Sequence, residues 1–570
     1  MLTDNAIQIL EDRFLLRDTE GRIVEDPDQL FRRVAKSVAN AEKIHKGNWE
    51  SRFYDIMRSM QFLPNSPTLM NAGLPNGQLS ACFVLPMNDS LQQIFTTLKD
   101  TAMIHQSGGG TGFNFSKLRP KNDLVSSSGG KSSGPIAFMK IYDTATEYVK
   151  QGGKRRGANM GILNVDHPDI EAFIAAKSDG TSLQNFNISV GITDDFMLAL
   201  EKQGDWELIN PRSGMVQNIV KAASIWEAIT EAAWKTGDPG LIFLDAINRD
   251  NPIPGQGSIQ STNPCGEVPL LDYESCNLGS LNLTKVVIND NGKVKIDWSK
   301  LETNIKIALR FLDNVITVNR YFLPQIKKVS TDNRKVGLGV MGWAELLLLS
   351  GIPYASREAV DLGGKLMKFI QEKSYETSYE LAKERGPFES WGESGYDSKI
   401  PMRNATCNSI APTGTISVIA STSYSIEPLY ALAYKRVGIL EDKTQVELNH
   451  VVIEKIKKMG LWTNQVKKEL LQSGSIQQLP LFPEEIKKLF KTSLEIPWKY
   501  HLLHQRAFQK YTDNAVSKTL NLPEETTAKE ISTIYLTAWK YGLKGITIYR
   551  NKSKTQQVLQ KCNFNNSPYC

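Results

Sequence analysis

The chain has 570 residues, of which 41% are hydrophobic and 22% charged, with a net charge of +6 at pH 7. This length allows roughly three to four ordinary domains, or one large barrel with additions, and the composition is that of a globular protein rather than a disordered one. The basic residues are scattered, no apolar run approaches the roughly 18 residues of a membrane span, and the first residues lack a signal-peptide pattern, so we expect a cytoplasmic protein with no nucleic-acid or membrane partner.

The first 64 residues are predicted to form a helical segment. Asp26-Pro27-Asp28 is a typical helix start. Apolar residues follow at helical spacing, at Leu30, Val34, Val38 and Ala41. No evident chemistry accompanies them, so this segment is expected to pack against the rest of the chain.

A hydroxyl-rich turn at 65–73 precedes a predicted buried strand that carries Cys82. Asp89-Ser90 is predicted to cap a helix whose apolar face comprises Leu91, Ile94, Phe95, Leu98 and Ala102. The helix ends in glycines at 108–112. Their spacing does not match the dinucleotide fingerprint, and the segment around Lys131 does not match the Walker loop. The glycines either approach a nucleotide closely or simply make a turn.

Polar loops follow, including one from Lys177 to Asn187, and long polar loops in a compact domain are often functional. From about 205 to 350, short strand-like segments alternate with helices, one of them predicted from Trp298 to Asn319. This alternation indicates an α/β layered or barrel architecture.

Within this region, the stretch Ser261 to Glu267 places an amide, a thiol and a carboxylate at alternate positions, in Asn263, Cys265 and Glu267. In an extended segment, alternate side chains project to one face, so these three could converge on one small substrate. A second cysteine, Cys276, follows shortly after. The stretch is therefore predicted to be a catalytic tip.

In the last third, a helix is predicted from Ser356 to Arg385, ended by Gly386-Pro387. Residues 410–417 read as a strand, then a hydroxyl-rich turn and the start of a helix, which together would hold a phosphate. Residues 440–500 are predicted to be a solvated helical excursion. A final strand at 543–550 precedes the tail, residues 551–570, with Cys562 and Cys570.

The six cysteines are too few for a disulfide scaffold, and each taken singly is more often a core residue than a reactive one. The six histidines include no HExxH pair, and no CxxC pair accompanies them, so no metal site is expected. His501 and His504 share a helical face, but two isolated imidazoles are usually ordinary polar groups. A serine hydrolase would lack its Gly-x-Ser-x-Gly elbow here.

Longer motifs carry more information than these single cysteines and histidines. From about Asn65 to Arg550 the chain contains PNSPTLMNAG, GQLSACFVLP, HQSGGGTGF, QGGKRRGANMG, STNPCGE, ESCNLGSLNL, APTGTIS, TDNAVSKT and GLKGITIYR. With these motifs the chain resembles the catalytic subunit of ribonucleotide reductase, and most closely the adenosylcobalamin-dependent class II enzymes. The resemblance implies an α/β barrel of ten strands, of the glycyl-radical type, with the radical cysteine on a central finger loop. It spans residues 65–550, after a helical segment at 1–64.

The resemblance implies radical chemistry on a ribose. Cys265 matches the cysteine that becomes a thiyl radical and removes the C3′ hydrogen atom. Glu267 matches the general base on the 3′-hydroxyl, and Asn263 the residue that holds the neighbouring hydroxyl. Cys82 and Cys276 match the pair that is oxidised to a disulfide as the 2′-hydroxyl leaves. A thioredoxin-like reductant would reset this pair.

Binding residues are implied in the same way. Matches to the family's substrate contacts are Ser66, Thr68, Ala81, Gly110, Pro412, Thr413, Gly414, Thr415 and Ile416. Asp89, Arg119 and Val125 match positions that bind a deoxynucleoside triphosphate effector near a homodimer interface. The loop from Lys177 to Asn187 matches the segment that relays effector identity to the choice of base.

Two departures from the family pattern bear on the class. Class I enzymes receive their radical from a second protein through two adjacent tyrosines, but here Ile548 precedes Tyr549, which favours adenosylcobalamin. The tail cysteines, Cys562 and Cys570, are more widely spaced than the family's CxxC pair, which leaves a shuttle role open. A ribonucleoside-diphosphate reductase is expected. The alternatives are a class I large subunit and a silent nucleotide-binding regulator with the same fold.

Overall fold

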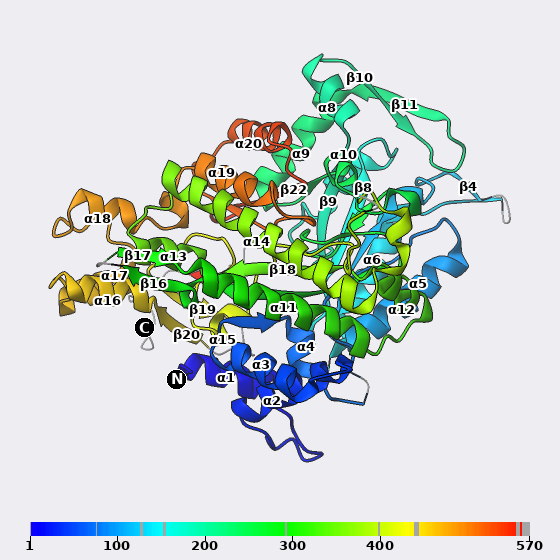
Figure 1. Ribbon diagram of the computed structural model, residues 1–570. Coiled ribbons are helices and arrows are strands. Elements are labelled where there is room, and N and C mark those ends of the chain that lie inside the picture. The colour runs from blue at the N-terminus through cyan, green and yellow to red at the C-terminus, as the bar shows by residue number, and fades with distance from the viewer. Residues whose placement is uncertain are drawn as a thin grey trace.

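The computed structural model describes residues 2–75, 77–125, 129–151, 155–290, 293–396, 399–437, 444–553 and 559–560. A sheet of ten strands forms its centre, with helices around it (Figure 1). In order across the sheet the strands are β1 (Phe62–Pro64), β15 (Ser275–Asn282), β2 (Cys82–Val84), β3 (Gly110–Asn114), β8 (Asn159–Asn164), β9 (Phe186–Ile192), β12 (Gly240–Phe243), β22 (Gly545–Arg550) and β21 (Thr519–Leu522), while β18 (Val336–Met341) pairs with β15. The expected α/β architecture with ten strands is confirmed.

The sheet is built from parallel runs that meet at antiparallel junctions. Strands β2, β3, β8, β9 and β12 run parallel, as do β15 with β18 and β21 with β22. The junctions β15 to β2 and β12 to β22 are antiparallel. Single bridges then link Leu338 of β18 to Asn408, and Ile410 to Val516. The segment 408–410 therefore connects the β18 edge of the sheet to residues just before β21, and it replaces the longer strand expected at 410.

Helices cover this sheet in the part of the chain that the structure describes. The longer ones are α5 (Leu91–Gln106), α6 (Pro135–Tyr148), α9 (Ala222–Thr236), α11 (Trp298–Val318), α14 (Arg357–Arg385), α19 (Trp498–Gln509) and α20 (Ala528–Lys540). The predicted boundaries of α11 and α14 are confirmed. Ser356 caps α14 through its hydroxyl, and Gly386 follows its last residue, as the sequence signals require.

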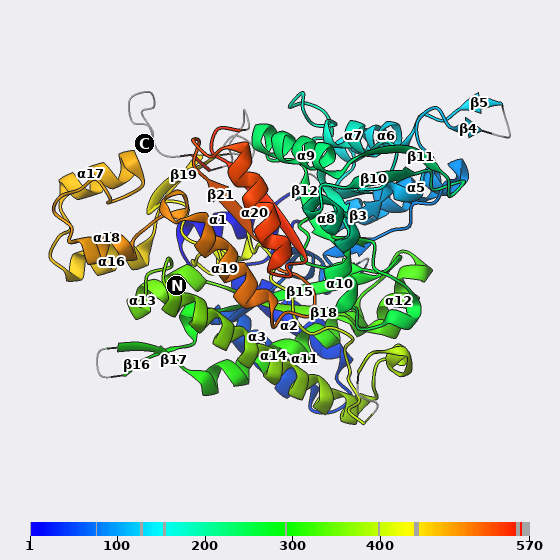
Figure 2. The same cartoon turned by 90° about the horizontal axis from the view of Figure 1, so that it is seen from above.

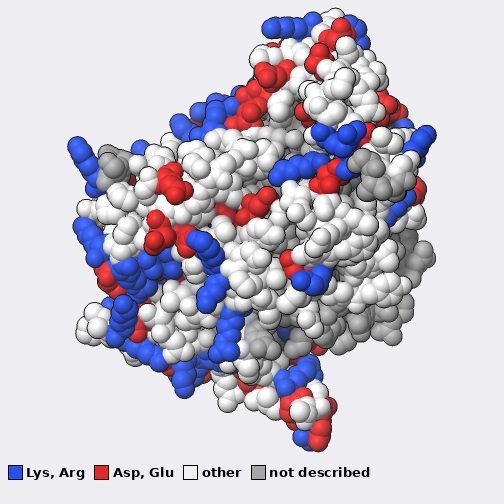
Figure 3. All heavy atoms as spheres, turned by 90° about the vertical axis from the view of Figure 1, so that its right-hand side faces the viewer, with Lys and Arg blue, Asp and Glu red and all other residues white. Residues whose placement is uncertain are grey.

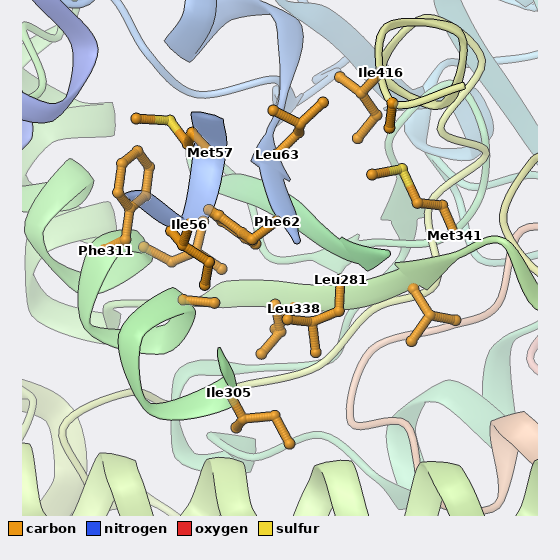
Figure 4. Close-up of a cluster of buried hydrophobic side chains, with 14 of the residues drawn as sticks. Ile56, Met57, Phe62, Leu63, Leu281, Ile305, Phe311, Leu338, Met341 and Ile416 are labelled. Atoms are coloured by element: carbon orange, nitrogen blue, oxygen red, sulfur yellow. The ribbon is translucent and has the colours of Figure 1, made fainter. Parts of the chain in front are cut away.

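The N-terminal segment consists of helices, as predicted: α1 (Asp4–Arg13), α2 (Pro27–Val38) and α3 (Lys46–Arg58). Asp26 and Gln29 form a reciprocal capping box at the start of α2. The inner faces of these helices share one apolar cluster with β1, α11 and β18, where Met57, Phe62 and Phe311 are fully buried (Figure 4). The segment is therefore continuous with the main core.

An ion-pair network reinforces the attachment of this segment. Buried Glu42, which lies between α2 and α3, accepts hydrogen bonds from Arg310 of α11 and Arg385 of α14. Arg385 also pairs with Asp313, which is fully buried. Removing one partner from such a network leaves a buried charge uncompensated, so the network holds one arrangement of the three helices.

Helix α5 differs from its prediction in one respect. Ile94 is buried as expected, but the side chains of Leu91 and Phe95 are 63% and 47% exposed. On the neighbouring helix α6, Ile141 is 39% and Tyr148 83% exposed. The side of the molecule that carries α5 shows broad areas without charged side chains (Figure 3). Part of the periodic apolar pattern of α5 thus faces outward instead of into the core.

Residues 450–490 form the helical excursion predicted from composition, with α16 (His450–Lys458), α17 (Asn464–Ser473) and α18 (Glu484–Leu489). These helices lie together at one end of the molecule (Figure 2). They are not merely solvated, because Val452, Ile456, Leu470 and Phe490 belong to a separate buried cluster. No helix in the described residues is both long and apolar enough to cross a membrane.

Candidate active site

A short hairpin carries the predicted catalytic tip. Strands β13 (Ser261–Thr262) and β14 (Pro269–Leu270) pair antiparallel. Between them the backbone turns, with the Gly266 N–H donating to the Asn263 carbonyl at 3.0 Å and Gly266 at φ +80°. Pro264 takes the second turn position, where its fixed φ is favourable. The tip is thus a turn rather than the predicted extended segment, and the turn geometry brings the three side chains together.

The glycines at 108–112 allow this hairpin to lie directly on the sheet. A Cβ atom on Gly112 would lie 1.7 Å from the Thr262 carbonyl oxygen, and one on Gly110 would lie 2.8 Å from the Pro264 ring. Neither separation is possible for non-bonded atoms, so glycine is required at both positions. These glycines therefore serve the close packing of two backbones, and Gly110 also lines the cavity described next.

A cavity of about 280 Å³ opens beside the tip. Asn263 and Glu267 line it and are buried, whereas Cys265 lines it and is exposed. The predicted site residues found in its wall are Asn263, Cys265, Glu267, Cys82, Ser66, Ala81, Gly110, Pro412, Thr413, Gly414, Thr415 and Ile416. Side chains from five separate segments of the chain thus meet in one cavity.

Hydrogen bonds hold the polar residues of the tip in place. The Asn263 amide nitrogen donates to the Cys82 sulfur at 3.1 Å, and its oxygen accepts from the Val268 N–H at 2.9 Å. The Glu267 carbonyl accepts from the Ser409 hydroxyl and from the Ala515 N–H, both at 2.9 Å. The orientation of the tip is therefore set before any substrate binds.

Cys82 and Cys276 lie directly opposite each other on β2 and β15. Side chains at such positions have Cβ atoms roughly 4.5–5.5 Å apart, and a disulfide needs about 3.5–4.5 Å, so a small adjustment would join them. Burial raises the pKa of the Cys276 thiol. Cys82 lines the cavity, whereas Cys276 is not among the lining residues. Neither cysteine takes part in a disulfide, and both are buried, in contrast to the exposed Cys265.

The turn from Pro412 to Ile416 forms another part of the cavity wall. Thr413 has φ +57°, and its hydroxyl oxygen accepts the Ser425 N–H at 2.8 Å. The helix expected after it, α15, is short (Ile416–Ile419). Helix α1 packs against α15, and its last residue, Arg13, lines the same cavity. Sequence reasoning missed Arg13, because nothing local to residues 1–64 indicates contact with a turn four hundred residues later.

Comparison with known proteins agrees with this geometry. The family profile described as "Ribonucleotide reductase, barrel domain" matches residues 80–549, and "Ribonucleotide reductase, all-alpha domain" matches residues 1–77. The chain belongs to the ribonucleotide reductase family. Its sequence is 47% identical to the vitamin B12-dependent ribonucleoside-diphosphate reductase of Thermoplasma acidophilum, over 98% of this chain and 80% of that one.

Two further reductases extend the comparison. A vitamin B12-dependent ribonucleoside-diphosphate reductase of Mycobacterium tuberculosis is 46% identical over 97% of this chain and 78% of its own length. The alpha subunit of the Actinobacillus ureae class Id ribonucleotide reductase superposes with a TM-score of 0.81 at 26% identity, covering 97% of each chain. The resemblance stated from the motifs is confirmed.

The other predicted residues that the structure describes are not in the cavity wall. Thr68 is fully buried and donates its hydroxyl hydrogen to the Leu79 carbonyl, outside the cavity wall. Cys562 and Cys570 lie outside the described residues. The three predicted effector residues do come together: Arg119 pairs with Asp89 at 2.7 Å and donates to the carbonyl of Leu124, the neighbour of Val125.

The histidines of α19 are ordinary buried polar groups. The His504 ring nitrogen Nε2 donates to the Tyr354 carbonyl at 2.9 Å, and burial lowers the pKa of His504 to about 3. Burial also holds the pKa of His501 well below its usual value. Among the described residues no group of three or more His, Cys, Asp and Glu side chains could hold a metal ion.

The environment of Cys265 fits a large external cofactor. Cys265 is exposed, while its neighbours Asn263 and Glu267 are buried. Adenosylcobalamin bound at this surface would therefore meet Cys265, the exposed residue of the three. Ile548, at the position of the missing second tyrosine, is buried in β22.

Proposed function

We propose that this chain reduces ribonucleoside diphosphates to the corresponding 2′-deoxyribonucleotides, with adenosylcobalamin as its cofactor. One observation carries the proposal: the exposed Cys265 thiol shares a cavity with Asn263, Glu267 and Cys82, and Cys276 lies in register with Cys82. The names of the relatives at 46% and 47% identity support the diphosphate substrate and the cofactor.

The first step is hydrogen-atom transfer at Cys265. Bound adenosylcobalamin would supply the radical that converts the Cys265 thiol into a thiyl radical. The Cys265 sulfur then takes the hydrogen atom from C3′ of the ribose. The Glu267 carboxylate accepts the proton of the 3′-hydroxyl, a transfer that requires hydrogen-bond reach. The amide of Asn263, fixed by Val268 and Cys82, hydrogen-bonds the neighbouring hydroxyl.

Reduction follows at C2′. The 2′-hydroxyl leaves as water, and the Cys82 and Cys276 thiols provide two electrons and two protons as they form a disulfide. The hydrogen atom held by Cys265 returns to C3′, which restores its radical. The balance is one ribonucleotide and one dithiol converted into one deoxyribonucleotide, one water and one disulfide. A thioredoxin-like protein would reduce the disulfide by thiol exchange, with Cys562 and Cys570 as relay.

The phosphate groups are assigned to the wall formed by Pro412 to Ile416. Its hydroxyls and N–H groups supply donors, and Arg13 adds a guanidinium, a strong partner for phosphate. We accordingly assign residues 65–550 to the catalytic unit and 1–64 to a helical segment that completes the phosphate site. Reduced thiols at the centre of the reaction favour a cytoplasmic location.

We further propose a homodimer that binds a deoxynucleoside triphosphate effector. The exposed apolar side chains of α5 and α6, including Leu91, Phe95 and Tyr148, suit burial against a second copy. The Asp89 and Arg119 pair lies at the start of α5, next to this face. An effector held there would lie at the interface of the dimer.

The test is formation of deoxycytidine diphosphate from cytidine diphosphate with adenosylcobalamin, a dithiol and a deoxynucleoside triphosphate. Wild-type protein and Cys407→Ala should turn over, since Cys407 is buried outside the cavity, while Cys265→Ser should show no product. Activity only with a separate radical-generating subunit would favour the class I alternative. Effector binding without any reduction would favour a regulator, and faster turnover of cytidine triphosphate would overturn the diphosphate assignment.

A further inference from the structure

A side chain from the sheet holds the catalytic hairpin from outside the cavity. The Asn187 amide nitrogen donates a hydrogen bond to the Pro264 carbonyl oxygen at 2.8 Å. Pro264 immediately precedes Cys265, so the bond acts on the peptide unit that carries the radical cysteine. Asn187 is not among the residues that line the cavity.

The backbone on either side of Asn187 is held by hydrogen bonds to neighbouring elements. It is the second residue of β9 and pairs with Met160 of β8. Two residues earlier, Asn185 receives support from α6, because its N–H donates to Asp143 at 2.8 Å and its amide donates to Glu147 at 3.2 Å. Lys177 donates to the Phe186 carbonyl at 2.7 Å. The loop that ends at Asn187 is therefore tied to α6 on one side and to the hairpin on the other.

The hairpin tip is held differently at its two ends. Beyond Cys265, Ser409 and Ala515 bind the Glu267 carbonyl from the opposite part of the sheet. Before Cys265, Pro264 has no N–H to donate, and Asn187 holds its carbonyl. The two anchors are in segments more than two hundred residues apart. The position of Cys265 between them depends on both.

We propose that Asn187 is a positioning residue that fixes Cys265 relative to the ribose and couples the hairpin to the 177–186 loop and helix α6. The proposal deepens the proposed function, on which its kinetic part rests. Asn187 is exposed on its strand, between buried Phe186 and Ile188, so its side chain contributes little to the core. Its removal should change the hairpin without unfolding the protein.

The variants are Asn187→Ala, Asn187→Asp and the control Asn218→Ala. The aspartate keeps the size of asparagine but has no N–H to donate. Asn218 is an exposed asparagine on β11 (Val216–Lys221), and its side-chain oxygen accepts the N–H of the adjacent Ile219. Hydrogen exchange of the peptide spanning 261–270 is measured in cofactor-free protein, followed by kcat and KM in the complete assay.

Both Asn187 variants should exchange the 261–270 peptide faster by about fivefold, the change that loss of one neutral hydrogen bond corresponds to. Their kcat should fall by about 10- to 100-fold, the effect expected when a reacting group is displaced by about 1 Å. KM for the nucleoside diphosphate should stay within about threefold, because the phosphate wall is untouched. Asn218→Ala should match wild type in every measurement.

Unchanged exchange together with kcat within twofold of wild type would overturn the proposal. So would a defect in Asn187→Ala that Asn187→Asp does not share, since side-chain volume rather than the donor would then matter. A fall in melting temperature that accounts for the loss of kcat would also count against it. If wild-type protein has no reductase activity, the proposed function fails, yet the exchange result still decides whether Asn187 holds the hairpin.

Discussion

The catalytic hairpin and the outer face of α5 and α6 are built in opposite ways. At the hairpin, glycines allow backbone to touch backbone, and the carbonyls of Pro264 and Glu267 are bonded from two parts of the sheet. On the outer face, Leu91, Phe95 and Tyr148 remain exposed. The first region is held by contacts within one chain, whereas the second leaves large apolar side chains exposed. Chemistry and assembly therefore impose different requirements on the same fold.

The largest effect should come from the carboxylate in the hairpin. Glu267→Gln keeps the size of the side chain but removes the base for the 3′-hydroxyl proton. We expect kcat to fall by about 10²- to 10⁴-fold, the usual contribution of general-base catalysis. Steady-state kinetics measure the effect. The control is Glu207→Gln, a substitution on the remote strand β10 (Asp205–Ile209). A Glu267→Gln enzyme with normal kcat would remove the base from the mechanism.

The outer face is tested by placing charge on it. Leu91→Lys and Phe95→Lys should weaken a two-fold dimer by about 100-fold or more, because each side chain is worth about 1.5–3 kcal/mol when buried and appears twice in such an interface. Analytical ultracentrifugation over a range of concentrations gives the dissociation constant. Ile44→Lys, at an exposed apolar residue of the N-terminal segment, is the control. Equal dimerisation in all variants would place the interface elsewhere.

Arg13 lines the same cavity as the hairpin, but it belongs to the separate N-terminal segment. Arg13→Ala should raise KM for the diphosphate by about 10- to 100-fold with a smaller change in kcat, as expected for one charge-assisted hydrogen bond to phosphate. Arg17→Ala is a suitable control because Arg17 is exposed and bonds to the Gly21 and Glu11 carbonyls. If both variants have the wild-type KM, Arg13 does not contact the substrate.

The smallest expected effect is on the free energy of unfolding, and catalysis should not change. Burial lowers the pKa of His504 to about 3, against about 6.5 in an unfolded chain. Between these values the unfolded state binds more protons, so the free energy of unfolding falls as pH decreases below 6.5, by about 1.4 kcal/mol per pH unit. Urea titrations at pH 7 and pH 5 should show a loss about 2 kcal/mol smaller for His504→Gln than for wild type. Equal losses would show that His504 titrates normally.

Sequence could predict what is local. The caps of α2 and α14, the strand carrying Cys82 and the cluster of Asn263, Cys265 and Glu267 each depend on a few consecutive residues. Helical periodicity correctly predicts α5, but it groups the exposed Leu91 and Phe95 with the buried Ile94, because spacing does not distinguish an interior apolar face from an exposed one.

The rest depends on long-range contacts. Asn187, Ser409 and Arg13 reach the hairpin or the cavity from 77, 142 and about 400 residues away along the chain. No spacing rule connects such positions. The alternate-residue pattern of the tip did bring its three side chains to one cavity, but through a turn at Gly266 rather than an extended strand.

The most direct test of the mechanism is a single turnover without added dithiol. Enzyme, adenosylcobalamin and excess cytidine diphosphate are quenched with an alkylating agent, and the cysteine peptides are mapped against the amount of product. In a Cys562→Ser/Cys570→Ser variant, whose tail cannot take over the disulfide, we predict one disulfide between Cys82 and Cys276 for each deoxynucleotide formed, with Cys265 still a reduced thiol. Product without that disulfide, or a disulfide that includes Cys265, would contradict the assignment of the three thiols.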